Sequence, residues 1–261
     1  MVMAKALKWF GALALVAALG AGAGVHMALR PAENVALVTP NTVALNPSAQ
    51  TNGTSTGLPL ALPANVLLPV PYTSQAPLGN WAARQHACEE ASLVMADRYL
   101  RGDHSGALID PTTADAAINQ VTAWKPAEDL TSGQVGEVAA KYLGWAYEVL
   151  PAEELTMRQQ LALGRPLIVG VRTHGLGNSA YPGYRSHYEQ PGWSVSHYLV
   201  VVGYDRSGSF VLNDPGITTG HGYHIAYNQL MHAIDDLDQA YPNLNSGRVF
   251  LVLAPAAANA V

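Results

Sequence analysis

Cysteine is almost absent from this chain, because its 261 residues include Cys88 and no other. A single thiol cannot form an internal disulfide, so no covalent cross-link stabilises the fold. It also cannot build a zinc site of the Cys-rich kind. If the protein is exported, one thiol exposed to oxidation needs a reason to be kept, either a functional role or shelter in the core.

Charge is also scarce. Only 13% of the residues are charged, the net charge is −5, and no basic run occurs. A phosphate backbone requires clustered Lys and Arg, so nucleic acid is not expected as a partner. Hydrophobic residues make up 49% of the chain, which is enough to build the core of one ordinary domain.

The N-terminal 30 residues have the pattern of an export segment. Lys5 and Lys8 precede an uncharged run, Trp9–Leu29. Two interpretations remain open: a signal peptide cleaved among the small residues Gly20–Gly24, or an N-terminal membrane anchor of bilayer length. Both place the N-terminus in the cytoplasm and the domain outside it, so we expect an extracytoplasmic protein, secreted or membrane-anchored.

The rest of the chain divides by composition. Residues 31–65 are rich in Pro, Ala, Asn, Thr, Ser and Gly and keep no helical or strand period, which predicts a flexible linker. Residues 66–255 form the predicted domain, and 256–261 form a tail.

Within the domain, helical periodicity precedes strand-like runs, and this segregation predicts an α+β fold. The predicted helices are 89–101, 110–122, 131–143, 152–163 and 228–236. The predicted strands are 66–70, 166–171, 198–204, 210–212, 223–227 and 248–253. The helix over 131–143 begins with a capping box, Thr131 to Gln134.

Cys88 stands directly before the first predicted helix. The positive end of the helix dipole stabilises a thiolate and lowers the pKa of a cysteine, as nucleophilic chemistry requires. The alternative is a small buried hydrophobic residue. Glu89 and Glu90 follow in the first turn, where acidic residues favour a helix N-terminus; contacts to a substrate are the alternative.

His197 is the best candidate for a base because it begins a predicted strand. A tight turn at 205–208 joins this strand to the next, so the two strands can pair antiparallel. Such a hairpin brings the end of the second strand beside His197, where Asp214 or Asn213 could orient the imidazole.

A developing oxyanion needs hydrogen-bond donors. The backbone N–H of Cys88 is one candidate. Gln75 and Gln85 are candidates for a second donor, and we prefer Gln75, which lies in a loop able to fold back over the site.

Three stretches together carry a family resemblance. V-P-Y-T-S-Q-A-P with C-E-E-A-S-L-V-M, then S-H-Y-L-V-V-V-G-Y-D, then V-L-N-D-P-G resemble the cysteine, histidine and acid motifs of papain-like peptidases related to the bacteriocin-processing, double-glycine-leader peptidases (cysteine peptidase family thirty-nine). The resemblance covers residues 66–253. It implies a papain-like fold, with a helical lobe and an antiparallel sheet lobe that flank a cleft.

The same resemblance implies a role for each site residue. Cys88 would be the nucleophile, His197 the general base, Asp214 the orienting residue and Gln75 the oxyanion donor. The distance in sequence from Gln75 to Cys88 is longer than in papain itself, so Gln75 departs from the papain pattern. No transporter is fused to the domain, so a leader-peptide substrate is not implied.

We therefore predict a cysteine peptidase that cleaves peptide or isopeptide bonds through a thioester and needs no cofactor. An acyl transferase or transpeptidase with the same site, and a non-catalytic surface peptide-binding module, are the alternatives. His174, His187, His221 and His224 could suggest a metal site, but no supporting acid on a helix accompanies them, so we predict no bound metal. Residues 178–194 are a candidate lid.

Overall fold

The computed structural model describes residues 62–125, 129–176, 195–217, 220–244 and 247–256. The predicted export segment, nearly all of the predicted linker, the candidate lid over 178–194 and most of the tail lie outside these ranges. Their assignments therefore stay predictions. No helix in the described ranges is long and apolar enough to cross a lipid bilayer.

The described residues form an antiparallel sheet in the order β2-β7-β3-β4-β5-β6, and β1 adds to the end of β4. The strands are β1 (Val66–Leu67), β2 (Trp145–Pro151), β3 (Leu167–Arg172), β4 (Ser196–Tyr204), β5 (Ser209–Asn213), β6 (His221–Ala226) and β7 (Val249–Pro255). The central strands β3 and β4 are buried nearly throughout, which explains their continuous runs of β-branched and apolar residues.

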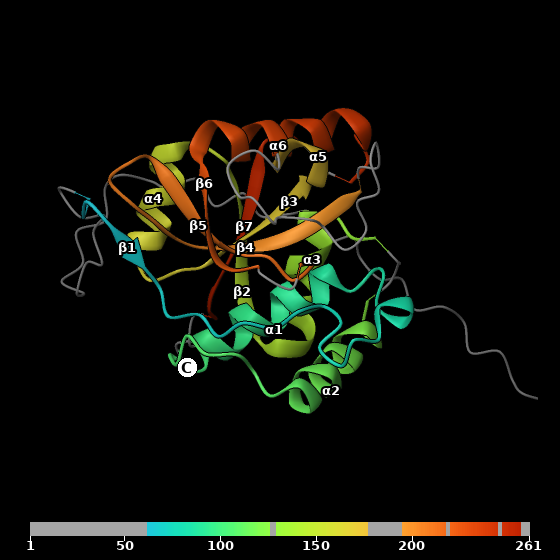
Figure 1. The fold of residues 1–261 in the computed structure, drawn as a ribbon. Helices are drawn as coiled ribbons and strands as arrows, with labels where there is room; N and C mark the ends of the chain where they lie inside the picture. Colours follow the sequence, from blue (N-terminus) through green and yellow to red (C-terminus); the bar gives the residue numbers. More distant parts are fainter. Residues whose placement is uncertain (1–61, 126–128, 177–194, 218–219, 245–246, 257–261) are drawn as a thin grey trace, which may run out of the picture. The chain divides into compact units, whose positions relative to one another are not determined.

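Helices cover both sides of this sheet, with α1 on one side and α6 on the other (Figure 1). The helices are α1 (Cys88–Leu100), α2 (Pro111–Thr122), α3 (Ser132–Val138), α4 (Glu154–Ala162), α5 (Thr173–Leu176) and α6 (Tyr227–Ala240). A 3-10 turn, η1 (Trp81–Ala83), precedes α1, and a π turn, η2 (Ala139–Leu143), follows α3.

Most of the helix α1 is buried. Ten of its 13 residues are buried, and the buried set includes the polar residues Glu89, Glu90 and Ser92. Leu93 and Met95 are fully buried against the core. Burying a carboxylate is costly unless it is hydrogen-bonded. Glu89 and Glu90 therefore need hydrogen-bond partners inside the protein, close to Cys88.

The predicted α+β class is confirmed, with a helical part that carries Cys88 and an antiparallel sheet that carries His197 and Asp214. This is the papain-like arrangement that the sequence predicts. The predicted capping box is present: Thr131 accepts from Gln134 N–H, and the Gln134 side chain accepts from Thr131 N–H.

Some elements differ from the predictions. The first strand is limited to Val66–Leu67, and α6 runs four residues beyond Asp236. The helix predicted over 131–143 ends as an α-helix at Val138 and widens into η2. The strand β2 was not predicted, because it is an edge strand with alternating exposure and no continuous apolar run.

Candidate active site

Cys88 is the first residue of α1 and is only 7% exposed. Its Sγ donates a hydrogen bond to Oε2 of the neighbouring Glu89 over 3.1 Å. The thiol proton therefore points to a carboxylate on its own helix in this structure.

The expectation of a lowered thiol pKa at Cys88 is wrong. Burial is the largest cause and raises the pKa of the Cys88 thiol well above its ordinary value, and the charge of Glu89 raises this pKa further. A hydrogen bond with the backbone of Tyr198 opposes these effects only in part. The helix dipole favours a thiolate, but it acts here against desolvation and an adjacent negative charge.

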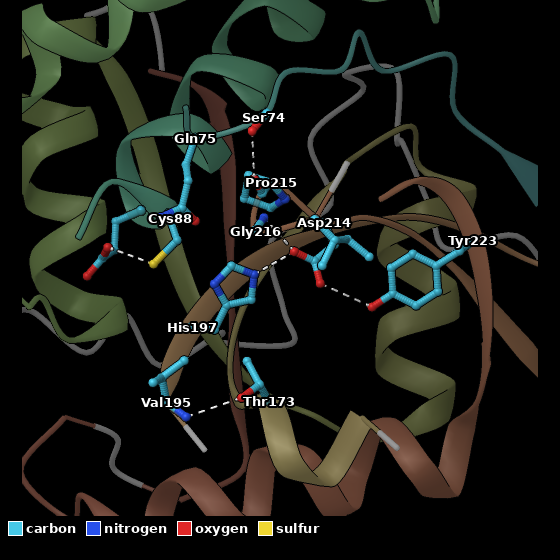
Figure 2. A network of polar contacts seen from close by, with 12 residues as sticks. Ser74, Gln75, Cys88, Thr173, Val195, His197, Asp214, Pro215, Gly216 and Tyr223 are labelled. Atoms are coloured by element: carbon cyan, nitrogen blue, oxygen red, sulfur yellow. Dashed lines mark hydrogen bonds and ion pairs between the residues drawn. The ribbon is translucent and has the colours of Figure 1, made fainter. Parts of the chain in front are cut away.

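His197 and Asp214 lie together, as the hairpin geometry predicts. His197 is the second residue of β4, and Asp214 directly follows β5, which pairs antiparallel with β4. His197 Nε2 is 2.6 Å from Asp214 Oδ1. Figure 2 shows the imidazole between the sulfur of Cys88 and the carboxylate of Asp214, with the second ring nitrogen on the side of Cys88.

The carboxylate of Asp214 is fully buried and receives two further donors. Gly216 N–H donates to Oδ1 over 2.8 Å, and the Tyr223 hydroxyl donates to Oδ2 over 3.4 Å. Asn213, the alternative neighbour, instead donates to the Val70 carbonyl and accepts from Gly222 N–H. Asp214 is therefore the side chain that contacts His197.

Gly216 packs so closely against this pair that no side chain fits there. A Cβ atom at this position would lie 2.7 Å from Cε1 of His197 and 3.2 Å from Oδ1 of Asp214. This glycine ends the acid motif V-L-N-D-P-G, and the motif alone assigns it no role. The glycine fills the space beside the imidazole and supplies a backbone N–H to the acid.

Gln75 lies in the site, but its side chain is engaged. Its Nε2 donates to the carbonyl of Arg84 over 2.8 Å and to that of Gln85 over 3.3 Å. Both carbonyls belong to the segment that leads into Cys88, and the Gln85 side chain is exposed. The amide hydrogens of Gln75 thus brace the approach to the cysteine, and acting as an oxyanion donor would require one of them to leave its carbonyl.

The segment around Gln75 is also tied to the loop that follows Asp214. Gln75 N–H and the Ser74 hydroxyl both donate to the Pro215 carbonyl, over 2.9 and 3.2 Å. The Tyr72 hydroxyl donates to the carbonyls of Asp214 and Ile217 over 2.9 and 2.8 Å. None of these contacts was predicted, because they join backbone atoms that no sequence motif marks.

A second anchor holds the start of β4. Thr173 N–H donates to the Val195 carbonyl over 3.1 Å, and Thr173 Oγ1 accepts from Val195 N–H over 3.2 Å (Figure 2). These bonds fix the chain two residues before His197.

Two of the four histidines considered for a metal site have other side-chain partners in the described residues. His224 pairs with Asp205 over 2.9 Å, and the ring of His221 stacks on Tyr72. The side chain of His174 and all of His187 lie outside the described residues. Across the described ranges, no three His, Cys, Asp or Glu residues are grouped to hold a metal ion.

Comparison with known proteins identifies the family of this chain. The model of the Peptidase_C39 like family matches residues 67–247. No curated protein matched the chain by sequence.

Three solved structures show distant similarity. A C39-like peptidase from Bacillus anthracis has a TM-score of 0.47 at 15% identity, over 74% of this chain and 99% of the other. Interpain A from Prevotella intermedia has a TM-score of 0.46 at 12% identity, over 76% of this chain and 97% of the other. Xylellain, a cysteine protease from Xylella fastidiosa, has a TM-score of 0.38 at 17% identity, over 75% and 87%.

The family match extends from β1 to the segment before β7 and includes Cys88, His197 and Asp214. The chain therefore belongs to the Peptidase_C39 like family and is a cysteine peptidase.

Proposed function

We propose that this protein hydrolyses peptide or isopeptide bonds through Cys88, His197 and Asp214. The observation that carries the proposal is the line of three side chains in Figure 2, in which His197 lies between the thiol and a buried carboxylate 2.6 Å from its Nε2.

The contact with Asp214 supports Nδ1 of His197 as the nitrogen that acts as the base. A carboxylate accepts hydrogen bonds, so Nε2 carries the ring hydrogen and donates it to Asp214. Nδ1 is then the unprotonated nitrogen on the side of Cys88. Asp214 holds the imidazole in this tautomer and stabilises the imidazolium that forms when Nδ1 takes a proton.

Acylation follows from this arrangement. Nδ1 of His197 takes the proton of the Cys88 thiol, and Sγ attacks the carbonyl carbon of the substrate. The carbon–nitrogen bond then breaks, the protonated His197 gives its proton to the leaving amine, and the acyl group remains on sulfur as a thioester. A water molecule, deprotonated by His197, attacks the thioester and regenerates the thiol.

The oxyanion of each tetrahedral intermediate needs donors near the start of α1. The backbone N–H of Cys88 is the first, since it belongs to the unpaired first turn of a helix. Gln75 is the proposed second donor, after one of its amide hydrogens leaves the Arg84 or Gln85 carbonyl. If its bracing role dominates, Gln75→Ala will lower both stability and activity, whereas loss of an oxyanion donor alone lowers activity only.

A digest of a peptide library tests the proposal. Wild-type protein should cleave a subset of peptides, and Cys88→Ala should cleave none of them above background. Cleavage by Cys88→Ala at the wild-type rate would refute the thioester mechanism. Adding amines to the same digest separates hydrolysis from acyl transfer, because transfer yields amine-capped products.

We also propose that the domain acts outside the cytoplasm. This proposal is supported by the basic and apolar pattern of residues 1–30 alone. Protease added to intact cells should degrade the domain if it is anchored on the outer side of the membrane, and the domain should appear in the extracytoplasmic fraction if it is secreted. A domain that stays protected in the cytoplasmic fraction would refute it.

A further inference from the structure

A buried tyrosine joins two parts of the site that lie far apart in the sequence. The hydroxyl of Tyr72 lies 2.9 Å from the carbonyl oxygen of Asp214 and 2.8 Å from that of Ile217, so it donates to one turn at two points. Tyr72 is 4% exposed. Burial, and after it the charge of Asp214, raise the pKa of this hydroxyl, so it keeps its proton and stays a donor at neutral pH.

The backbone of Tyr72 is bound to a different part of the fold from its hydroxyl. Tyr72 N–H donates to the Ala107 carbonyl over 2.9 Å, and Ile109 N–H donates to the Tyr72 carbonyl over 2.8 Å. These bonds hold Tyr72 to the segment that leads into α2, the helix that packs on α1. The ring of His221 stacks on the Tyr72 ring, with 5.1 Å between the centroids and 8° between the planes. The direction of the hydroxyl is therefore set by the backbone and by the stacked ring.

The hydroxyl of Tyr72 acts on the turn that carries the orienting acid. Asp214 N–H donates to the Gly220 carbonyl over 2.8 Å, so the chain closes on itself after Asp214. The two passes are so close that a Cβ atom at Gly220 would clash with the Asp214 carbonyl oxygen. The same turn supplies Gly216 N–H to the Asp214 carboxylate. A shift of the turn would therefore move the carboxylate and one of its donors together.

We propose that Tyr72 is a positioning residue, whose hydroxyl holds the turn 214–217 so that the Asp214 carboxylate stays against Nε2 of His197. It acts through Asp214 and not on the reacting atoms. This inference rests on the proposed function and adds a residue to it. Asp214 selects the tautomer with hydrogen on Nε2. If the turn relaxes, the ring also populates the tautomer with hydrogen on Nδ1, which cannot act as the base towards Cys88.

A second support of the turn limits the size of the expected effect. Gln75 N–H and the Ser74 hydroxyl donate to the Pro215 carbonyl over 2.9 and 3.2 Å, and Figure 2 shows the contact from Ser74. These bonds remain when the Tyr72 hydroxyl is removed, so the turn should shift without unfolding. The loss of activity should therefore be smaller than the loss in Asp214→Ala.

The substitution Tyr72→Phe removes the hydroxyl and keeps the ring that stacks on His221. Tyr204→Phe is the matched control, because Tyr204 is 1% exposed and its hydroxyl donates to the Pro63 carbonyl over 2.9 Å. Tyr204 ends β4, at the opposite end of the strand from His197. Each variant loses the donor hydroxyl of a buried tyrosine, so both should unfold at a lower urea concentration than wild type. A role in stability alone predicts the same kinetics for both.

The first measurement separates kcat from KM on a library peptide that wild type cleaves. In Tyr72→Phe, kcat should fall about tenfold while KM stays within about twofold, because the base is misplaced but the binding surface is kept. In Tyr204→Phe, kcat should stay within about twofold of wild type. A kcat for Tyr72→Phe that also stays within about twofold, or an equal loss in both variants, overturns the proposal.

The second measurement needs no activity and reads the imidazole directly. In full-length Cys88→Ala protein, the ¹⁵N chemical shifts of His197 should show the neutral ring with its hydrogen on Nε2. Adding Tyr72→Phe should raise the fraction with hydrogen on Nδ1, and an unchanged tautomer overturns the role of Tyr72. The two proposals fail separately. Activity that survives Cys88→Ala refutes the peptidase mechanism, whereas activity that needs Cys88 together with an unchanged tautomer refutes only the positioning role.

His221→Ala provides a second variant if Tyr72→Phe does not fold. It removes the ring that stacks on Tyr72 and leaves the hydroxyl in place, and His221 is exposed, so the domain should tolerate the change. Its kcat and its His197 tautomer should shift in the same direction as in Tyr72→Phe, but by less. If Tyr72→Phe is unfolded and His221→Ala matches wild type in both measurements, Tyr72 serves the fold alone and the positioning role is refuted.

Discussion

Two buried carboxylates flank the reactive pair, and the protein supplies them with hydrogen bonds in different ways. Asp214 receives His197, a backbone N–H of Gly216 and a tyrosine hydroxyl, so its charge is surrounded by donors. Glu89 receives the backbone N–H of Leu130 and the thiol of Cys88, and burial raises its pKa. The same functional group thus contacts the imidazole on one side of the site and the thiol on the other.

Removing the base should have the largest effect. His197→Ala should lower kcat/KM by about 10⁴-fold, since proton transfer by a positioned side chain is lost. Initial rates on a cleaved library peptide measure this loss, and circular dichroism checks the fold. A variant that keeps activity within tenfold of wild type would refute the role of His197 as the general base.

Removing the orienting acid should have a smaller effect. Asp214→Ala should lower kcat/KM less than His197→Ala does, because the imidazole remains but loses the group that fixes its tautomer. Asp214→Asn should lose less, since an amide oxygen can still accept from Nε2–H. Equal activity in wild type and Asp214→Ala would mean that the surrounding packing alone orients His197.

Adding a methyl group beside His197 and Asp214 should lower kcat/KM less than removing either side chain. Gly216→Ala places a methyl group within 2.7 Å of Cε1 of His197, so the ring or the loop must move. We expect about a tenfold loss in kcat/KM, because displacing a reacting group lowers the rate. Gly133→Ala is the control, as its nearest neighbour would be 3.8 Å away. Similar kinetics in both variants would contradict the close packing at Gly216.

Removing the N-cap of α3 should lower stability more than catalytic activity. This cap, Thr131, directly follows Leu130, whose N–H binds Glu89. Thr131→Ala removes the hydroxyl that accepts from Gln134 N–H and should lower the free energy of unfolding by about 1 kcal/mol. Urea unfolding measures this change, while kcat/KM should stay within about twofold if Leu130 keeps its place. A large loss of activity with unchanged stability would place Thr131 in the site itself.

The sequence could predict the contact of His197 with Asp214 because a short hairpin determines it. The turn at 205–208 fixes which strand ends are adjacent, and only 17 residues separate the two side chains. The order of helices and strands was predictable for a similar reason, since apolar periodicity is local in the chain.

Features that depend on tertiary packing were not predictable in this way. The partner of Glu89 is a backbone N–H 41 residues away, in a loop without a motif. The pKa of Cys88 was predicted in the wrong direction, because the helix position is visible in the sequence whereas the depth of burial is not. The edge strand β2 was missed because it has little apolar signal of its own.

The bonds from Tyr72 and Gln75 to the loop after Asp214 have a consequence for folding order. The Tyr72 hydroxyl reaches carbonyls 142 and 145 residues further along the chain. Closing so long a loop costs conformational entropy before any contact is gained. During synthesis, Cys88 therefore emerges long before the residues that complete its surroundings, and the chain acquires a working site only after β5 has been added.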